Sequence, residues 1–178
     1  SIQMTNLVIG AEARIYLSFQ PKIASAYSAV HQWLGEIPDA QGYKEFDYEK
    51  DILHCLEKGD LKSTAFQFYS LFPRYYFESV HILDKIIKSR HLLSRIKYNP
   101  RICLIDVGGM GAASVAFIER ILAWYQDEEI VNPIEIICLG IEPDFSGVTL
   151  YSKLMNEVKN NVKSLNINLE FQIICDSV

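Results

Sequence analysis

Three acidic residues and a cluster of glycines are the residues of this sequence best suited to bind a small polar ligand. Each acid follows an apolar run, and the glycines follow the first acid: Asp106, Gly108, Gly109, Gly111, Glu142 and Asp176. A loop of glycines bends sharply, approaches a ligand closely and directs its backbone N–H groups outward. A carboxylate accepts hydrogen bonds and can hold both hydroxyls of a ribose. The pattern therefore indicates a binding site for a small molecule.

The apolar runs before these acids predict strands that alternate with helices. Strands are expected at Ile102–Val107, Ile134–Ile141 and Ile167–Cys175, and helices at Ala112–Tyr125 and Gly147–Val162. This alternation predicts parallel strands and an α/β fold. The nearly continuous apolar character of the second strand is typical of a strand covered on both faces. Ligands of open α/β sheets bind at the carboxyl ends of the strands, so we expect the acids and glycines to meet there.

The segment Leu104–Ala113, LIDVGGMGAA, resembles motif I of the class I S-adenosylmethionine-dependent methyltransferases. The family usually has glycine at alternate positions after the acid. This chain has Gly108, Met110 and Ala112 at those positions, with an extra glycine at Gly111. This difference from the family pattern would alter the shape of the loop and therefore the affinity for the cofactor.

Two further acids carry the same resemblance. The segment 139–147, LGIEPDFSG, resembles the second motif, in which the acid, here Glu142, binds the ribose of the cofactor. Asp176 matches the third motif and would face the adenine amino group. The resemblance implies a partial Rossmann-like parallel sheet with strand order 3-2-1. It also implies that S-adenosylmethionine is bound by Asp106, Gly108, Gly109, Gly111, Glu142 and Asp176.

The reaction implied by the resemblance is transfer of a methyl group from the sulfonium of S-adenosylmethionine to a small-molecule hydroxyl or similar nucleophile. The protein would align donor and acceptor in a dry pocket, with a base where deprotonation is required. No catalytic residue is identified, and a role for His81 or His91 as general base stays open. The two histidines are expected on one helix, ten residues apart, and could share a face.

Other functions stay open beside this one. A non-catalytic methyltransferase-like binding or scaffolding module would keep the fold without the reaction. A nicotinamide-dependent oxidoreductase is disfavoured, because no G-x-G-x-x-G pattern starts at Gly108. An RNA methyltransferase is disfavoured by the net charge of -5 and the absence of a Lys/Arg cluster. Taken singly, Asp106 could cap a helix, Glu142 could belong to a turn, and Asp176 could lie on the surface.

The first hundred residues have helical periodicity. Helices are expected at Leu7–Phe19, Ile23–Leu34, Tyr43–Leu56, Leu61–Phe72 and Tyr75–Ile96. The segment Phe66–Phe77 is rich in aromatic residues, which predicts that it fills the space between the helices and the sheet. An alternative is a cap over the ligand pocket, with Arg74 and Tyr75 or Tyr76 supplying polar groups.

These elements suggest two parts: residues 1–99 as a helical cap region, and residues 100–178 as the N-terminal half of a methyltransferase-like Rossmann domain. The sheet of the family normally has seven strands with the first one central, whereas three are expected here. The first strand would then be an apolar edge, which promotes association unless it is covered. We therefore expect a missing chain segment or a partner chain to complete the sheet, or the N-terminal helices to cover it.

The cysteines and the hydrophobic pattern complete the sequence-based description. The four cysteines, at Cys55, Cys103, Cys138 and Cys175, have no paired spacing and are expected to be buried free thiols, with no metal site. No apolar run approaches the ~20 residues of a membrane span, and the N-terminus lacks the features of a signal peptide. A soluble cytoplasmic protein that does not bind membranes is expected.

Overall fold

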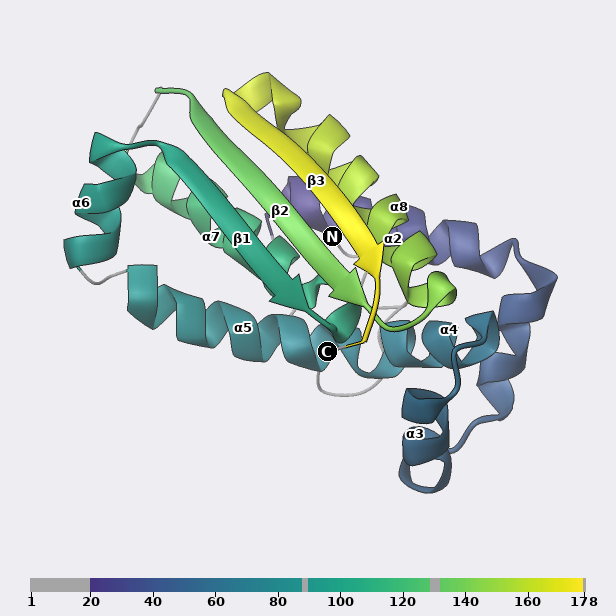
Figure 1. The fold of residues 1–178 in the computed structure, drawn as a ribbon. Coiled ribbons are helices and arrows are strands. Elements are labelled where there is room, and N and C mark those ends of the chain that lie inside the picture. Colours follow the sequence, from purple (N-terminus) through teal and green to yellow (C-terminus); the bar gives the residue numbers. More distant parts are fainter. Residues whose placement is uncertain (1–19, 88–89, 129–131, 178) are drawn as a thin grey trace.

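The computed structural model describes residues 20–87, 90–128 and 132–177. It combines a three-stranded parallel sheet with helices and is therefore an α/β structure (Figure 1). The expected helix Leu7–Phe19 lies outside the described residues. All three strands and both helices expected after Pro100 are present.

The sheet consists of β1 (Arg101–Val107), β2 (Ile134–Glu142) and β3 (Ile167–Cys175). Both pairings are parallel, β1 with β2 and β2 with β3, as expected for strands joined through helices. The strand order is β1-β2-β3 in place of the expected 3-2-1. The two orders list the strands from opposite edges of the sheet. In the structure β1 is hydrogen-bonded to β2, and β2 to β3. β2 is central, and β1 is an edge strand.

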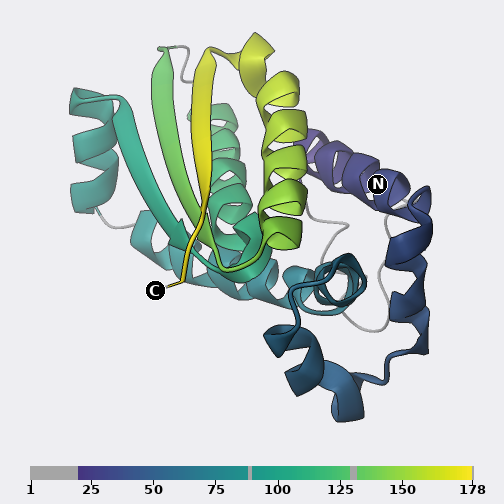
Figure 2. The same cartoon turned by 45° about the vertical axis from the view of Figure 1, so that its right-hand side comes forward.

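Helices cover one face of the sheet. α7 (Ala112–Asp127) and α8 (Phe145–Val162) lie together on that face (Figures 1 and 2). The opposite face has no described helix over it, and Ile105 and Val107 are 69% and 57% exposed there. The prediction that both faces of β2 are covered is therefore wrong for the described residues. Its outward side chains are only partly buried, because neighbouring strands shield their flanks and, among the described residues, no helix packs over that face.

The N-terminal helices pack against the helices that cover the sheet. α2 (Pro21–Gly35) lies along α8, and the amide of Asn161 donates to the carbonyl of Lys22 at 2.8 Å. α4 (Leu61–Ser70) and α5 (Phe72–Ile87) follow, and α5 packs on α7. The helices and the sheet share one hydrophobic core. The division of the chain at residue 99 stays a prediction.

Capping explains why the region expected as one helix at Tyr43–Leu56 is divided. It consists of the 3₁₀-helix η2 (Pro38–Glu45) and the helix α3 (Tyr48–Glu57). The side chain of Asp47 accepts hydrogen bonds from the N–H groups of Glu49 and Lys50, both at 3.0 Å. An aspartate with this geometry begins a new helix.

The long helix expected at Tyr75–Ile96 is likewise divided, into α5 and α6 (Arg90–Tyr98). α6 turns away from α5 towards the amino end of β1 (Figure 1). Lys97 of α6 lies near the C-terminal end of α7: its ammonium group is 5.9 Å from the ring centre of Trp124 and 3.1 Å from the carboxylate of Glu128. Periodicity alone did not show this break, because both helices keep the same apolar spacing. His81 and His91 therefore lie on different helices, so the expectation that they share a helix is wrong.

The aromatic segment is largely buried, but its ring contacts are with residues of the helical region and not with the sheet, so the predicted position between helices and sheet is only partly confirmed. The rings of Tyr27 and Phe68 stack with centres 4.6 Å apart, and Phe72 lies 5.5 Å from Tyr27. Its other buried members are Phe66, Tyr69 and Tyr76. Arg74 and Phe77 of the segment are exposed, and Arg74 pairs with Glu78; Tyr75 is partly buried and lies beside the loop that follows β1.

Candidate ligand-binding site

The loop between β1 and α7 adopts a backbone conformation that glycine favours. We call residues 108–111 the glycine loop; all four have positive φ, with Gly108 at 75°, Gly109 at 76°, Met110 at 55° and Gly111 at 89°. Left-handed conformations of this kind are strained for a residue with a Cβ. The predicted need for glycine is confirmed at three positions. Met110 adopts the left-handed conformation although it has a Cβ, and its side chain is buried at 3% exposure.

Two of the glycines differ in what surrounds them. A Cβ at Gly108 would meet nothing within 4 Å, so the loop faces open space there. A Cβ at Gly111 would lie 2.8 Å from the ring of Tyr151, so glycine is required for packing as well as for conformation. The loop therefore has one face available to a ligand and one face pressed onto α8.

Asp106 is the centre of a buried polar network beneath the loop. Its Oδ2 atom accepts hydrogen bonds from the N–H of Ser114 at 3.1 Å, the hydroxyl of Ser114 at 2.6 Å and the hydroxyl of Tyr151 at 3.0 Å. The thiol of Cys138 lies 3.1 Å from the Ser114 hydroxyl and 3.3 Å from the Tyr151 hydroxyl. Each hydroxyl has one proton, so when both donate to Asp106 the thiol is the remaining donor.

This network gives Asp106 a structural function. Ser114 lies in the first turn of α7, so Asp106 satisfies a backbone N–H at the start of that helix, which is the capping alternative raised by the sequence. Burial and the nearby Asp106 carboxylate raise the pKa of Tyr151 far above its usual value. Burial also raises the pKa of the Cys138 thiol. Both groups therefore remain protonated.

Glu142 ends β2 and turns towards the glycine loop. Its Oε1 atom accepts a hydrogen bond from the N–H of Met110 at 2.7 Å, and the residue is 4% exposed. A Cβ at Gly147 would lie 3.1 Å from the other carboxylate oxygen, so a glycine in the first turn of α8 leaves room for this side chain. Burial raises the pKa of Glu142 to about 7; the carboxylates of Asp106 and Asp144 add to the effect, and the Met110 N–H opposes it.

Asp176 lies at the same edge of the sheet but is not directed at the loop. Its N–H donates to the carbonyl of Glu142 at 2.9 Å, which extends the pairing of β3 with β2 by one residue. Its exposed carboxylate accepts from the N–H of Ser177 at 2.8 Å. The structure therefore brings Asp176 close to Glu142 through the backbone, while the side chain forms a local turn.

A cavity of about 410 Å³ opens beside the glycine loop. α5 supplies one wall, with Tyr75, Glu78 and Ser79, and the loop and the start of α7 supply the other. A second cavity, of about 250 Å³, continues it along α5 and β1 and becomes apolar. Its lining shares Ser79, Ile82, Asp106 and Ala113 with the first cavity. The combined space offers backbone N–H groups at the start of α7, the carboxylates of Glu78 and Asp106, and an apolar extension.

The polar network around Asp106 was not predicted from the sequence. Asp106 is bonded to Ser114 and Tyr151, and Cys138 joins the network through these two hydroxyls. The three residues come from three separate elements, α7, β2 and α8. No spacing rule links such positions. Glu78 and Ser79 were not predicted either; they reach the site because α5 packs on α7.

The expectation that all four cysteines are buried needs correction. Cys55 and Cys138 are buried free thiols as expected, but Cys103 and Cys175 are exposed. Cys103 lies on the uncovered face of β1 and Cys175 at the end of an edge strand, so an apolar sequence context did not imply burial. His81 is exposed on α5 and does not line the cavities beside the loop; its role as a base stays open.

Comparison of the chain with models of protein families, with curated proteins and with solved structures finds no match in any of the three. Within the described ranges, no helix combines the length and apolar character needed to cross a membrane. In the same ranges, no group of three or more His, Cys, Asp or Glu side chains is arranged to hold a metal ion.

Proposed function

We propose that this protein is an S-adenosylmethionine-dependent methyltransferase with a Rossmann-like sheet, acting on a hydroxyl or similar nucleophile of a small molecule. The observation that carries the proposal is the convergence of Asp106, the glycine loop and Glu142 at one edge of the sheet. The cavity beside the loop, at about 410 Å³, has the size of a small-molecule site.

The chemistry of the cavity fits the amino-acid end of this cofactor. N–H groups at the start of α7 favour its carboxylate. The carboxylates of Asp106 and Glu78 favour its cationic groups. The open space beside Gly108 allows close approach to the backbone. When bound, S-adenosylmethionine supplies an electrophilic methyl group, and the protein orients the acceptor and excludes water.

Glu142 is the residue proposed to hold the ribose. Its Oε1 atom accepts from the N–H of Met110, and its Oε2 atom would accept from the ribose hydroxyl; Glu142 itself is 4% exposed and lies outside the lining of both cavities. Because burial raises the pKa of this carboxyl to about 7, its ionisation near neutral pH would govern how well it accepts.

The test is calorimetric titration of S-adenosylmethionine and S-adenosylhomocysteine into the purified chain, beside Glu142→Ala. Glu170→Ala is the matched control, because Glu170 is exposed on the edge strand β3 and pairs with Lys159 of α8. We expect binding by the parent chain and the control, and loss of at least tenfold in affinity for Glu142→Ala, which corresponds to about 1.4 kcal/mol. A folded parent chain that binds neither compound contradicts the proposal.

A second candidate is a non-catalytic binding module. It is favoured by Met110, whose N–H occupies an oxygen of Glu142 and whose side chain fills space where the resembling family has glycine. Retained binding of S-adenosylhomocysteine, without methyl transfer to any compound of a panel of hydroxylated aromatic acceptors, would favour this candidate.

A further inference from the structure

We propose that the cavity of about 250 Å³ between α5, β1 and α7 binds a small organic amine, whose apolar body fills the cavity and whose ammonium group pairs with Asp106. We call this space the apolar cavity. The proposal does not depend on the proposed methyl transfer. It is tested without S-adenosylmethionine, so a failure of amine binding and a failure of cofactor binding are separate results.

The walls of the apolar cavity are largely hydrocarbon. They consist of Ile82 and Leu83 of α5, Leu104 and Ile105 of β1, and Ala113 and Phe117 of α7. An apolar cavity of about 150 Å³ holds a molecule of the size of benzene. The apolar cavity, at about 250 Å³, therefore admits one ring with a short chain. Ile82 and Ile105 are 57% and 69% exposed, so a ligand can enter between α5 and β1.

Asp106 brings a buried negative charge to this apolar space. It lines the cavity and is 9% exposed. The hydrogen bonds from Ser114 and Tyr151 all reach its Oδ2 atom, and no donor of the described residues reaches Oδ1. No Lys, Arg or His within the described ranges forms an ion pair with it. Because buried charges in proteins are normally paired, a cationic ligand suits this position.

An organic ammonium group fits this environment better than a metal ion or a hydroxyl. A metal ion needs several polar ligands, but the part of the chain that the structure describes has no group of three or more His, Cys, Asp or Glu arranged for one. A hydroxyl donates to Oδ1 but leaves the charge unpaired. An ammonium group forms a charge-assisted hydrogen bond with the carboxylate. Its apolar body is removed from water against Leu83 and Phe117.

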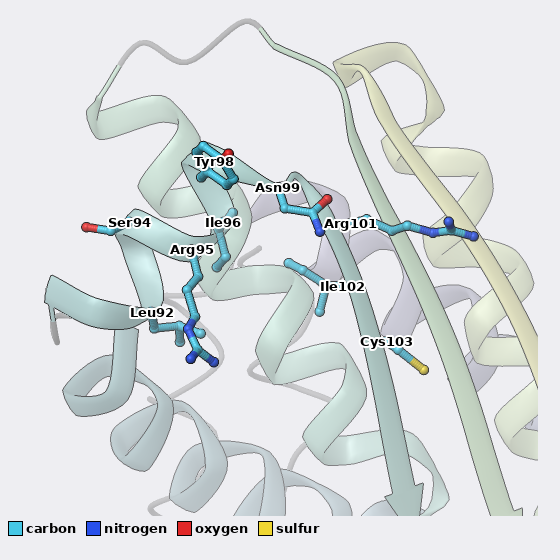
Figure 3. A pocket seen from close by; sticks show the side chains of 9 residues that line it. All are labelled: Leu92, Ser94, Arg95, Ile96, Tyr98, Asn99, Arg101, Ile102 and Cys103. Atoms are coloured by element: carbon cyan, nitrogen blue, oxygen red, sulfur yellow. The ribbon is translucent and has the colours of Figure 1, made fainter.

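The larger cavity at the amino end of β1 does not share these properties. Figure 3 shows Arg95 of α6 and Arg101 of β1 at this space of about 750 Å³. Both arginines are exposed, and Arg101 pairs with Glu135 at 3.5 Å. Positive charges disfavour an ammonium group, so we expect the amine beside Asp106 and not here.

A matched pair of ligands tests the charge. Phenethylamine is protonated at pH 7, as other alkyl amines are, and phenethyl alcohol has the same ring and chain with a neutral hydroxyl. In NMR titrations of the purified chain at pH 7, we expect the amine to bind at least tenfold more tightly than the alcohol. Equal affinities for the two compounds, or no binding of the amine to the folded chain, overturn the proposal.

Two substitutions identify the carboxylate that pairs with the amine. Asp106→Asn keeps an oxygen that accepts from Ser114 and Tyr151 but removes the charge, so the preference for the amine over the alcohol should disappear. Glu78→Gln is the matched control, because Glu78 lines the cavity of about 410 Å³ and not the apolar cavity. This variant should keep the preference. A preference that survives Asp106→Asn contradicts the pairing.

A further pair of variants tests the location and leaves Asp106 in place. Leu83→Trp adds bulk to the wall of the apolar cavity and should weaken amine binding at least tenfold. Lys85→Trp places the same side chain at an exposed position of α5 outside the lining, and it should bind as the parent does. If Leu83→Trp binds the amine as tightly as Lys85→Trp, the amine lies elsewhere and the proposal is wrong.

Discussion

The carboxylate of Glu142 accepts a hydrogen bond from the backbone N–H of Met110 at 2.7 Å, and this contact joins the end of β2 to the glycine loop. It holds the buried side chain of Glu142, which is 4% exposed, against the backbone of the loop. It also stabilises Met110 in a left-handed conformation, with φ of 55°. This hydrogen bond thus links the strained loop to Glu142, the acid of the site whose pKa is raised.

The stability of the protein should fall as pH rises through the range in which Glu142 ionises. Its pKa is about 7 in the folded chain against an ordinary value of 4.5, so the folded state holds the proton more tightly. The stabilisation is fully present below pH 4.5 and is lost as pH rises through 7. Its upper bound is about 3 kcal/mol, at about 1.4 kcal/mol per pH unit.

The measurement is urea denaturation at several pH values between 5 and 8, for the parent and for Glu142→Gln. The amide does not titrate, so the free energy of unfolding of Glu142→Gln should vary less with pH over this range. Identical pH profiles for the two proteins would show that Glu142 titrates outside it.

Ligand binding should show the opposite dependence on pH. The ionised form of Glu142 accepts hydrogen bonds better, so S-adenosylhomocysteine should bind about tenfold more tightly at pH 8 than at pH 6, following the ionised fraction for a pKa near 7. Calorimetry at both pH values tests this. If the affinity of the parent protein is the same at both pH values, Glu142 does not hold the ribose.

Alanine substitutions in the glycine loop should separate strain from packing. Gly108→Ala places a Cβ in open space at positive φ, which should cost about 1 kcal/mol of unfolding free energy. Gly111→Ala adds a clash with the ring of Tyr151 and should cost about 2–4 kcal/mol. Denaturant unfolding checks both values, and equal losses would mean that Tyr151 can move aside.

Removing the Tyr151 hydroxyl should destabilise the network around Asp106. Tyr151→Phe loses the donor to Asp106 and leaves the Ser114 and Cys138 groups with fewer partners, which should cost about 1–2 kcal/mol. Tyr98→Phe is the control, because Tyr98 is 93% exposed and its change should be near zero. Thermal unfolding of both variants against the parent gives the comparison.

Thiol reactivity should divide the cysteines into two pairs. Cys103 and Cys175 are exposed and should react rapidly with an aromatic disulfide reagent in the native protein, whereas Cys55 and Cys138 are buried and should react only in denaturant. The double variant Cys103→Ser/Cys175→Ser should show no rapid phase. A rapid phase that persists in this variant would place Cys55 or Cys138 at the surface.

The sequence by itself determined the elements after Pro100 and their order. Apolar runs next to acids and glycines predict β1, β2 and β3, because local periodicity reports which residues prefer an extended strand. It also determined the glycine loop, since only glycine adopts positive φ without strain. Parallel strands then bring Asp106 and Glu142 to one edge without further information.

The tertiary structure decided what periodicity does not encode. Which face of the sheet is covered depends on where α7 and α8 pack, so the exposure of Cys103 and Ile105 could not be read from an apolar run. The direction of α6 differs from that of α5, although the same apolar spacing runs through both helices, so local periodicity did not reveal two helices. The network around Asp106 includes Tyr151, which donates to Asp106, and Cys138, which contacts the hydroxyls of Ser114 and Tyr151; only packing brings these distant positions within hydrogen-bonding distance. Local preferences thus specify the strands and the loop, whereas burial and long-range contacts specify the chemistry of the site.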